Sequence, residues 1–455
     1  MNSICRVAIM LLALLKLVSL LVKYDLSLLM FAVVLIILIT GLPLMGSGFR
    51  NITAFLGIAG SAVLLHGGHP LSSWALAFNS MTSVIAILVI MQLFSVPMEA
   101  GRYNLAVQYW LQKSVTSAAA LFLVTTVVTH LLASFLMFGS IPVMVSMLSG
   151  MLEKSVANYR RFISVTASRG YVLASLWAPG AINLLLVAQA TGARWLDLVI
   201  PGFLLAMIGI TTSYLLEIRQ TMAQAFFQEA KADLREQLAE EAARRKAWII
   251  GLAIISLLVL TVAFEKLNLG ASSDRIALAG AVVGAVWICS VRKQPGFSMV
   301  MAEYWRSGVL KSMDVSILFI AMGVFSTAIA KSGFLGAVQF QLQSIANVLG
   351  VFSVVLLPLL VIIASLIGIH PFISILLVGQ VLTSLQLPVA PVTTALCLAL
   401  GGSISYMASP FAGVILTLAK YVNCTTRDIA FRWNWRFCSV FFIEGIVFAY
   451  VWGRI

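Results

Sequence analysis

A helix-length apolar stretch near the middle of the chain is interrupted at its centre. Residues 175–189 read SLWAPGAINLLLVAQ, and Ala178, Pro179 and Gly180 break the run. Proline removes a backbone donor and clashes with the preceding helical turn, and glycine tolerates dihedral angles that end a helix. In hydrocarbon, an unwound backbone is tolerated only where protein buries it or where it lines a water-filled cavity. The break therefore predicts either an ordinary proline kink or a binding site made of helix ends.

A second copy of the pattern favours the binding site. Residues 405–420 read SYMASPFAGVILTLAK, and Ala408 follows Ala178 at a distance of 408 − 178 = 230 positions. Two upstream matches share an offset of 231: AVQYWLQ at 106–112 with AVQFQLQ at 337–343, and LAS at 132–134 with IAS at 363–365. Three matches in the same order, at nearly one separation, indicate two homologous halves.

Composition predicts an all-α polytopic membrane protein. Of the 455 residues, 61% are hydrophobic and only 10% are charged. The net charge of +13 is explained by positive cytoplasmic loops, so no nucleic-acid partner is expected. The five cysteines lack the paired spacing of a disulfide framework or a metal site. The sequence contains no phosphate-binding GxxxxGK[ST] loop, HExxH or GxSxG motif, so we expect neither an enzyme nor a cofactor beyond a coupling Na⁺ or H⁺.

The apolar runs predict about 11 transmembrane helices plus two re-entrant hairpins in two inverted repeats. An odd number of crossings in each half makes the halves inverted. The expected divisions are an N-terminal extra helix (1–25), repeat 1 (26–216) with a hairpin at 118–152 and a broken helix at 165–190, a cytoplasmic linker helix (217–246), and repeat 2 (247–455) with a hairpin at 348–385 and a broken helix at 392–421. We interpret the first run as a retained membrane helix, with a cleaved signal peptide as the alternative.

Basic residues predict the orientation. With the N-terminus in the cytoplasm and the C-terminus outside, most basic residues fall on the cytoplasmic side: Arg50, Arg102, Lys113, Lys154, Arg160, Arg161, Arg292, Lys293, Arg306, Lys311, Arg427, Arg432 and Arg436. This bias is typical of a multi-pass protein of a cell inner membrane. The charged linker is most simply a surface helix, and a partner-docking role is the alternative.

Three short motifs resemble the ion transporter superfamily, which includes divalent anion/sodium symporters, arsenite-pump permeases and related antiporters. Residues 314–320 (DVSILFI) through 330–334 (AKSGF) resemble the helix and small-residue connector of that group. Residues 175–187 resemble its GTPPNII segment, with Asn183 at the position of the family asparagine, and residues 407–410 (MASP) resemble the second copy. The resemblance implies a transport domain made of the hairpins and broken helices, a scaffold of the remaining spans, and a homodimer.

The sequence departs from that group at the hairpin tips. The symporters carry Ser-Asn-Thr there, whereas this chain has GSIP at 139–142 and GIHP at 368–371. The antiporter-type members use intramembrane carboxylates near the breaks. Here Glu444, in the last span, is the only carboxylate deep in a predicted helix.

The tips and breaks supply the candidate substrate-binding residues: Ser140, Pro142, Ala178, Pro179, Gly180, Asn183, His370, Pro371, Ser405, Ser409 and Pro410. Helix N-termini at such breaks carry partial positive charge, and the hydroxyls and the amide add neutral ligands. Donors without carboxylates predict a small anionic substrate. His370 is either a proton carrier or a buried neutral histidine, and Glu444 is a second candidate for proton or ion coupling. His66, His69 and His130 are expected to lie in loops or at helix edges.

These observations predict a secondary active transporter that moves a small anion, an organic carboxylate or an oxyanion, by alternating access coupled to an ion. Two alternatives stay open: a cation/proton antiporter of the same superfamily, and an accessory membrane subunit that works with a partner.

Overall fold

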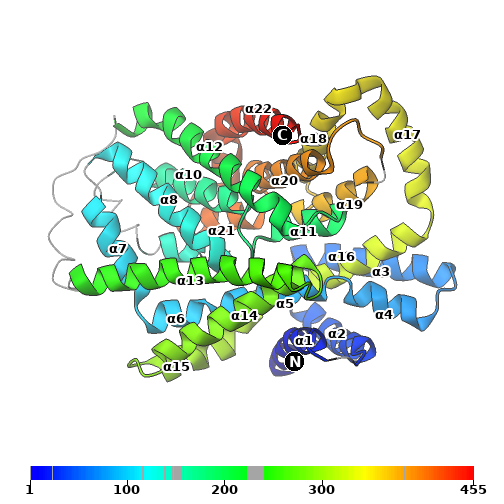
Figure 1. The fold of residues 1–455 in the computed structure, drawn as a ribbon, viewed down its shortest axis with the longest axis horizontal. Helices are drawn as coiled ribbons and strands as arrows, with labels where there is room; N and C mark the ends of the chain where they lie inside the picture. The colour runs from blue at the N-terminus through cyan, green and yellow to red at the C-terminus, as the bar shows by residue number, and fades with distance from the viewer. Residues whose placement is uncertain are drawn as a thin grey trace. The chain divides into compact units, whose positions relative to one another are not determined.

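The computed structural model describes residues 2–22, 24–114, 117–137, 140–145, 147, 156, 158–222, 240–383 and 385–454. These segments form helices joined by short connections (Figure 1). Within this described part, 12 helical stretches are long and apolar enough to cross a membrane. They confirm the expected all-helical, multi-pass class. The stretches include 119–136, 339–366 and 391–422, which cover limbs of both expected hairpins and the second broken helix.

The helices group into two compact units, and each unit combines one stretch from each half of the chain. Unit 1 consists of Met1–Ala100 and Ser256–Ser344. Unit 2 consists of Gly101–Ile255 and Ile345–Ile455. Apart from residues 247–255, which belong to unit 2, each of the two expected repeats therefore contributes its earlier part to unit 1 and its later part to unit 2.

Unit 1 is built around two helices that are buried along most of their length. These are α5 (Thr82–Leu93) and α16 (Met313–Lys331), which are apolar on nearly every side, as expected for helices enclosed by others. The surrounding helices are α1 (Asn2–Ser19), α2 (Ser27–Gly41), α3 (Ser47–His66), α4 (Leu71–Asn79), α6 (Ser95–Ala100), α14 (Ser272–Val291) and α15 (Phe297–Glu303). Helix α16 packs against α3, α4 and α2, and α5 packs against α1 and α14.

Unit 2 holds the segments that the sequence analysis assigns to hairpins and broken helices. Its helices are α7 (Tyr103–Ser114), α8 (Ala118–Leu136), α10 (Tyr159–Ala174), α11 (Ile182–Thr191), α12 (Trp195–Met222), α18 (Ser353–Leu366), α19 (Pro371–Thr383), α20 (Pro391–Ala408), α21 (Gly413–Val422) and α22 (Trp435–Trp452). Helices α18 and α19 pack against each other across the short turn 367–370. Of the first expected hairpin, residues 138–139, 146 and 148–152 lie outside the described residues.

Two long helices run from one unit into the other along the chain. Helix α13 (Glu240–Lys266) joins the end of the expected linker to the following span without interruption. Residues 223–239 of the linker lie outside the described residues. At the start of α13, Glu240 pairs with Lys113, and Lys246 donates to the carbonyl of Arg102 at 3.4 Å. The second such helix is α17 (Phe334–Leu349).

Backbone features recur at an offset of 231 residues, the same offset as the upstream sequence matches. Three pairs of residues with positive φ are each 231 positions apart: Arg102 and Gly333, Met137 and Gly368, and Gly192 and Asn423. Three pairs of helices also begin 231 positions apart: α5 and α16 (313 − 82), α7 and α17 (334 − 103), and α11 and α21 (413 − 182). Left-handed backbone is uncommon for residues other than glycine, so its recurrence in register is informative.

A buried ion pair in unit 1 provides a test of its packing. Lys16 Nζ lies 3.1 Å from Asp274 Oδ1, and Ser83 Oγ donates to the same oxygen at 2.6 Å. The side chain of Asp274 is 7% exposed. Removing one charge of a buried pair leaves the other uncompensated, so Asp274→Asn should lower the free energy of unfolding by about 3 kcal/mol, measured by denaturation in micelles.

The matched control for that variant is Asp197→Asn. Asp197 pairs with Arg194 at 2.7 Å, but its side chain is 41% exposed. An exposed pair contributes at most about 1 kcal/mol, so the control should unfold almost like the parent. Equal losses in the two variants would contradict the structural role assigned to Asp274.

Candidate functional site

The two broken helices of unit 2 cross each other. Helix α10 ends at Ala174 and α11 begins at Ile182, so the first break spans 175–181 and contains Pro179. Helix α20 ends at Ala408 and α21 begins at Gly413, so the second break contains Pro410. Helix α10 packs against α8, α20 and α21, and α11 packs against α19 and α20. Each broken helix therefore contacts the other, and both contact limbs of the hairpin segments.

The short helices after the breaks begin without a side-chain cap. The capping positions are Ala181 for α11 and Ala412 for α21, both with extended backbone and no side-chain cap hydrogen bond. Their separation is 412 − 181 = 231. Ser, Thr, Asp or Asn normally occupies this position and accepts a bond from the first helical turn. An alanine leaves the first N–H groups, and the positive end of the helix dipole, without a side-chain acceptor from the cap.

Asn183 holds the first break against α20. Its amide nitrogen Nδ2 donates to the carbonyl of Ala399 at 2.9 Å and to Ser403 Oγ at 2.9 Å. Ser403 Oγ also lies 3.0 Å from Ser175 Oγ at the end of α10. A side chain at Gly402 would collide with Asn183 Oδ1, so the close approach of the two helices requires glycine there. Asn183 is 1% exposed, and within the described part of the chain its Oδ1 has no hydrogen-bond partner.

A small cavity of about 20 Å³ lies at this crossing. It is lined by Ala133, Met137, Tyr171, Ala174, Ser175, Ala181, Ile182, Asn183, Phe372 and Tyr406. The lining contains residues of the first turns of α11 and α19 and no charged side chain. This volume is enough for about one water molecule.

Tyr406 lines the cavity and carries a buried hydroxyl group. The side chain is 3% exposed, and its ring centre lies 5.4 Å from that of Phe372 in an edge-on arrangement. Among the described residues, no group forms a hydrogen bond with the Tyr406 hydroxyl. A buried hydroxyl without a partner carries a desolvation cost of about 1–3 kcal/mol, and a bound polar ligand would offset it.

His130 supports the first break from α8. Its Nε2 accepts a hydrogen bond from Trp177 Nε1 at 3.0 Å, and its Nδ1 lies 3.3 Å from the carbonyl oxygen of Gly170. This pair of contacts suits one neutral tautomer, with the proton on Nδ1. The sequence predicts His130 in a loop or at a helix edge, whereas the structure buries it within α8 at 2% exposure. The neighbouring Trp177 in the break is the partner that sequence alone does not identify.

Arg169, on the broken helix α10, donates hydrogen bonds to several segments, and this cluster of contacts is called the Arg169 hub. Its guanidinium donates to Asn434 Oδ1 at 2.9 Å, Ser213 Oγ at 3.2 Å, Glu217 Oε1 at 3.0 Å and the carbonyl of Trp433 at 3.0 Å. The side chain is only 1% exposed. These contacts join α10 to α12 and to the segment before α22. Arg169 is not among the site residues predicted from the sequence, although a charged residue inside a membrane-length apolar region is a usual signal of a special site.

Of the predicted site residues, Asn183 lines the central cavity. Ala178, Pro179 and Gly180 form the break that leads into it, and Ser405 precedes Tyr406 on α20. Ser405 is 1% exposed, and its Oγ has no partner within the described residues.

The other predicted residues hold the hairpin segments and breaks in place. Ser409 Oγ donates to the carbonyl of Ser365 at 2.8 Å and accepts from the backbone N–H of Phe411, beside Pro410. Ser140 Oγ donates to the carbonyl of Met137 at 2.7 Å, at the start of the helical residues 140–145 that include Pro142.

The two candidates for proton coupling lie outside the cavity lining. His370 is half-buried, and its Nδ1 accepts from the backbone N–H of Phe372 at 3.3 Å, next to Pro371 at the start of α19. Glu444 on α22 accepts from Thr212 Oγ1 on α12 at 2.8 Å. Neither residue is among those that line the cavity.

Comparison with known proteins identifies a fold. No family model matches the chain, and no curated protein matches its sequence. Among solved structures, the chain is similar to the YdaH transporter of Alcanivorax borkumensis, with a TM-score of 0.53 and 15% identity. The match covers 83% of this chain and 86% of that one. At this identity the likeness establishes the shared fold, and the chemistry of the site has to be argued from the residues of this chain.

The Arg169 hub can be tested by stability. Arg169→Ala removes four hydrogen bonds and leaves Glu217 with less compensating charge, so the free energy of unfolding should fall by about 3–5 kcal/mol. Arg169→Lys should rescue little of this loss, because an ammonium group cannot reproduce the planar fork of donors.

The control is Arg160→Ala, an exposed arginine on the same helix, measured by the same denaturation in micelles. It should change the free energy of unfolding by no more than about 0.5 kcal/mol. A loss in Arg169→Ala as small as that of the control would show that the hub is dispensable.

Proposed function

We propose that this protein is a secondary active transporter that moves a small anion, an organic carboxylate or an oxyanion, across a membrane by alternating access. The observation that carries the proposal is the uncharged cavity at the crossing of the two broken helices. The likeness of the fold to a protein described as a transporter supports the same class. Na⁺ or H⁺ is the proposed coupling ion.

The choice of an anion follows from the groups at the cavity. Residues of the first turns of α11 and α19 line it, and helix N-termini favour negative charge. Tyr406 adds a hydroxyl that can donate a hydrogen bond, whereas the Ser175 hydroxyl already donates to the carbonyl of Val172 and the Asn183 amide nitrogen already donates to α20. The lining contains no carboxylate, so a bare cation would find only carbonyl and hydroxyl oxygens. A site that offers hydrogen-bond donors and no negatively charged acceptor suits an oxyanion.

Alternating access follows from the size of the cavity and from the repeat. A space of about 20 Å³ cannot hold a carboxylate solute, so we infer that the surrounding helices separate to admit one. The backbone features that recur at an offset of 231 support two homologous halves. Inverted halves give two related conformations, each open to one side of the membrane, around a site at their interface.

We propose that unit 2 binds the substrate. That unit contains both broken helices and the helices of the hairpin segments, and α12 and α22 pack against them. We therefore add α12 and α22 to the transport domain expected from the sequence, because Arg169 bonds α10 to residues of α12 and to Asn434 beside α22. Unit 1 would form the scaffold and the contact of a homodimer in the inner membrane, with the N-terminus in the cytoplasm.

Tyr406→Phe separates ligand binding from stability. The hydroxyl has no partner among the described residues, so its removal should leave the unliganded protein equally stable or slightly more so. If the hydroxyl binds the anion, the variant should lose about 1.5–3 kcal/mol of binding free energy, the range for a hydrogen bond to a charged group. The measurement is calorimetric binding of whichever of acetate, succinate, citrate, sulfate or phosphate stabilises the parent in a thermal-shift screen.

The matched control is Tyr421→Phe, because Tyr421 is 54% exposed on α21. Its binding should equal that of the parent. The anion proposal would be wrong if Tyr406→Phe also bound like the parent. If only a cation stabilises the protein and this effect is lost in Glu444→Gln, the cation/proton antiporter replaces the anion carrier.

Asn183→Ala tests the amide at the cavity. Asn183 bonds α20 through Nδ2 and lines the cavity, so the variant should weaken both the protein and the binding of the same anion, the latter by about 1–3 kcal/mol. Transport by reconstituted vesicles that contain only this chain should fall in parallel. Absence of any uptake or counterflow by the parent in such vesicles would favour the accessory-subunit alternative.

A further inference from the structure

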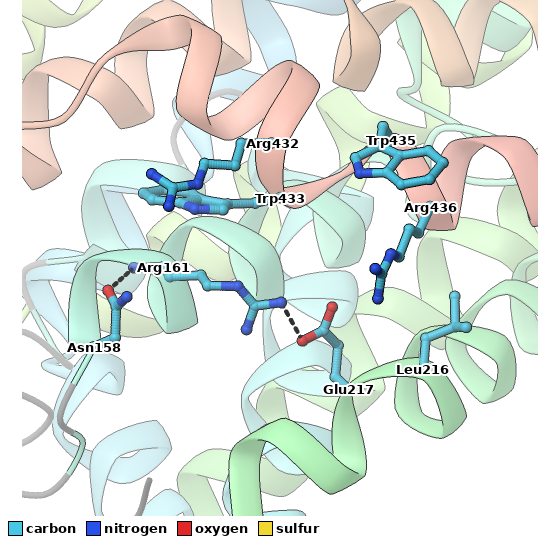
Figure 2. Close-up of a pocket in the computed structure, with 8 residues that line it drawn as sticks. All are labelled: Asn158, Arg161, Leu216, Glu217, Arg432, Trp433, Trp435 and Arg436. Atoms are coloured by element: carbon cyan, nitrogen blue, oxygen red, sulfur yellow. Dashed lines mark hydrogen bonds and ion pairs between the residues drawn. The ribbon is translucent and has the colours of Figure 1, made fainter. Parts of the chain in front are cut away.

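A second and larger cavity lies in unit 2, separate in its lining from the central one. Its volume is about 350 Å³, and its lining residues are Asn158, Arg161, Leu216, Glu217, Arg432, Trp433, Trp435 and Arg436 (Figure 2). They come from the start of α10, the later part of α12, the π-helical turn η6 (Asp428–Trp433) and the start of α22. The two cavities share no lining residue.

The charges at this cavity are predominantly positive. Arg161, Arg432 and Arg436 face one lining carboxylate, Glu217. Glu217 is already engaged, because its two oxygens accept from Arg161 Nη2 at 2.6 Å and from Arg169 Nη2 at 3.0 Å. Its side chain is 6% exposed, so it serves chiefly to balance those two buried or half-buried arginines.

Arg432 and Arg436 are the arginines left to meet a ligand. Arg432 lies 3.8 Å from Asp428, a loose pair in which its own side chain is 79% exposed. Within the described part of the chain, Arg436 forms no ion pair, and its guanidinium lies 5.6 Å from the centre of the Trp435 ring. Figure 2 shows Arg161 and Arg436 extending from different walls toward the same side of the cavity as the Glu217 carboxylate. The Arg432 guanidinium lies on the opposite side of the cavity in this view, over Trp433. A guanidinium group suits a phosphate, which it can bind in a bidentate manner.

The apolar part of the lining lies at the ends of two candidate membrane spans. Leu216 is near the end of the span 195–218 and is 38% exposed. Trp435 begins the span 435–452 and is 53% exposed. Tryptophan at a span end is typical of the level of lipid headgroups, and basic residues on the expected cytoplasmic side face the leaflet that carries anionic lipids. A phosphate held here would sit where the acyl chains of the same molecule could reach the hydrocarbon.

We propose that this cavity binds the phosphate of an anionic phospholipid headgroup, with Arg436 as its ligand, Arg432 adding positive charge from the opposite side of the cavity, and Trp435 against the glycerol region. Arg161 is held by Glu217 and shapes the cavity floor. This proposal is independent of the anion carried at the central cavity, because it rests on different residues.

The test measures lipid binding to the purified, full-length protein. The probes are short-chain phosphatidylglycerol and phosphatidylcholine of equal chain length, together with glycerol phosphate and inorganic phosphate as soluble sources of the same group. The readout is native mass spectrometry, with tryptophan fluorescence as a second signal. Variants are Arg432→Gln, Arg436→Gln and the double variant, and the control is Arg427→Gln, an exposed arginine in the same segment that does not line the cavity.

Phosphatidylglycerol should bind more tightly than phosphatidylcholine. Each lining variant should weaken it about fivefold and the double variant about thirtyfold, while Arg427→Gln binds like the parent. Equal binding of the two lipids, or equal losses in the lining and control variants, would overturn the proposal. Binding of glycerol phosphate or inorganic phosphate as tight as that of phosphatidylglycerol would also overturn it, because the source would then be a soluble phosphate. Unchanged thermal unfolding of the variants in phosphatidylcholine excludes misfolding as the cause of any loss.

Discussion

The constraint on which the rest of the structure depends is that a backbone inside hydrocarbon must satisfy its own polar groups. The two broken helices violate it at their interruptions, and alanines at 181 and 412 provide no side-chain acceptor to repair the following helix starts. The protein compensates by crossing the breaks within unit 2 and by surrounding them with other helices. In the proposed function, these uncapped helix ends bind an anion that the rest of the hydrocarbon region would exclude.

A second layer of polar contacts keeps these breaks in register. His130 holds Trp177 in the first break, Asn183 bonds the α11 helix to α20, and Ser409 bonds the second break to α18. The buried guanidinium of Arg169 joins α10 to two further segments, α12 and the residues just before α22. Buried polar networks of this kind tolerate few alternatives, because a half-satisfied network is costlier than an apolar one. The site is therefore positioned by hydrogen bonds as much as by apolar packing.

The class of protein and the positions of the helix interruptions are predictable from the sequence, because hydropathy and proline act on local structure. Pro179 and Pro410 indicate where the helices end, and the matches at an offset of 231 point to the pairing of segments. Contacts between segments that are far apart in the chain are not predictable from the sequence. Arg169 finds Glu217 48 positions away and Asn434 265 positions away, and no local pattern encodes such pairs. Tyr406 looks like an ordinary aromatic residue of an apolar helix until the fold places it in the lining of the cavity.

The central claim is that the cavity between the broken helices opens to each side of the membrane in turn. The most direct measurement replaces the five native cysteines, introduces Ala181→Cys in the cavity wall, and labels it in vesicles with a membrane-impermeant thiol reagent applied from either side. The account predicts labelling from both sides, in proportions that shift when the gradient of the stabilising anion is reversed, and slower labelling when that anion is saturating. Labelling from one side only under every gradient, while transport continues, would contradict it.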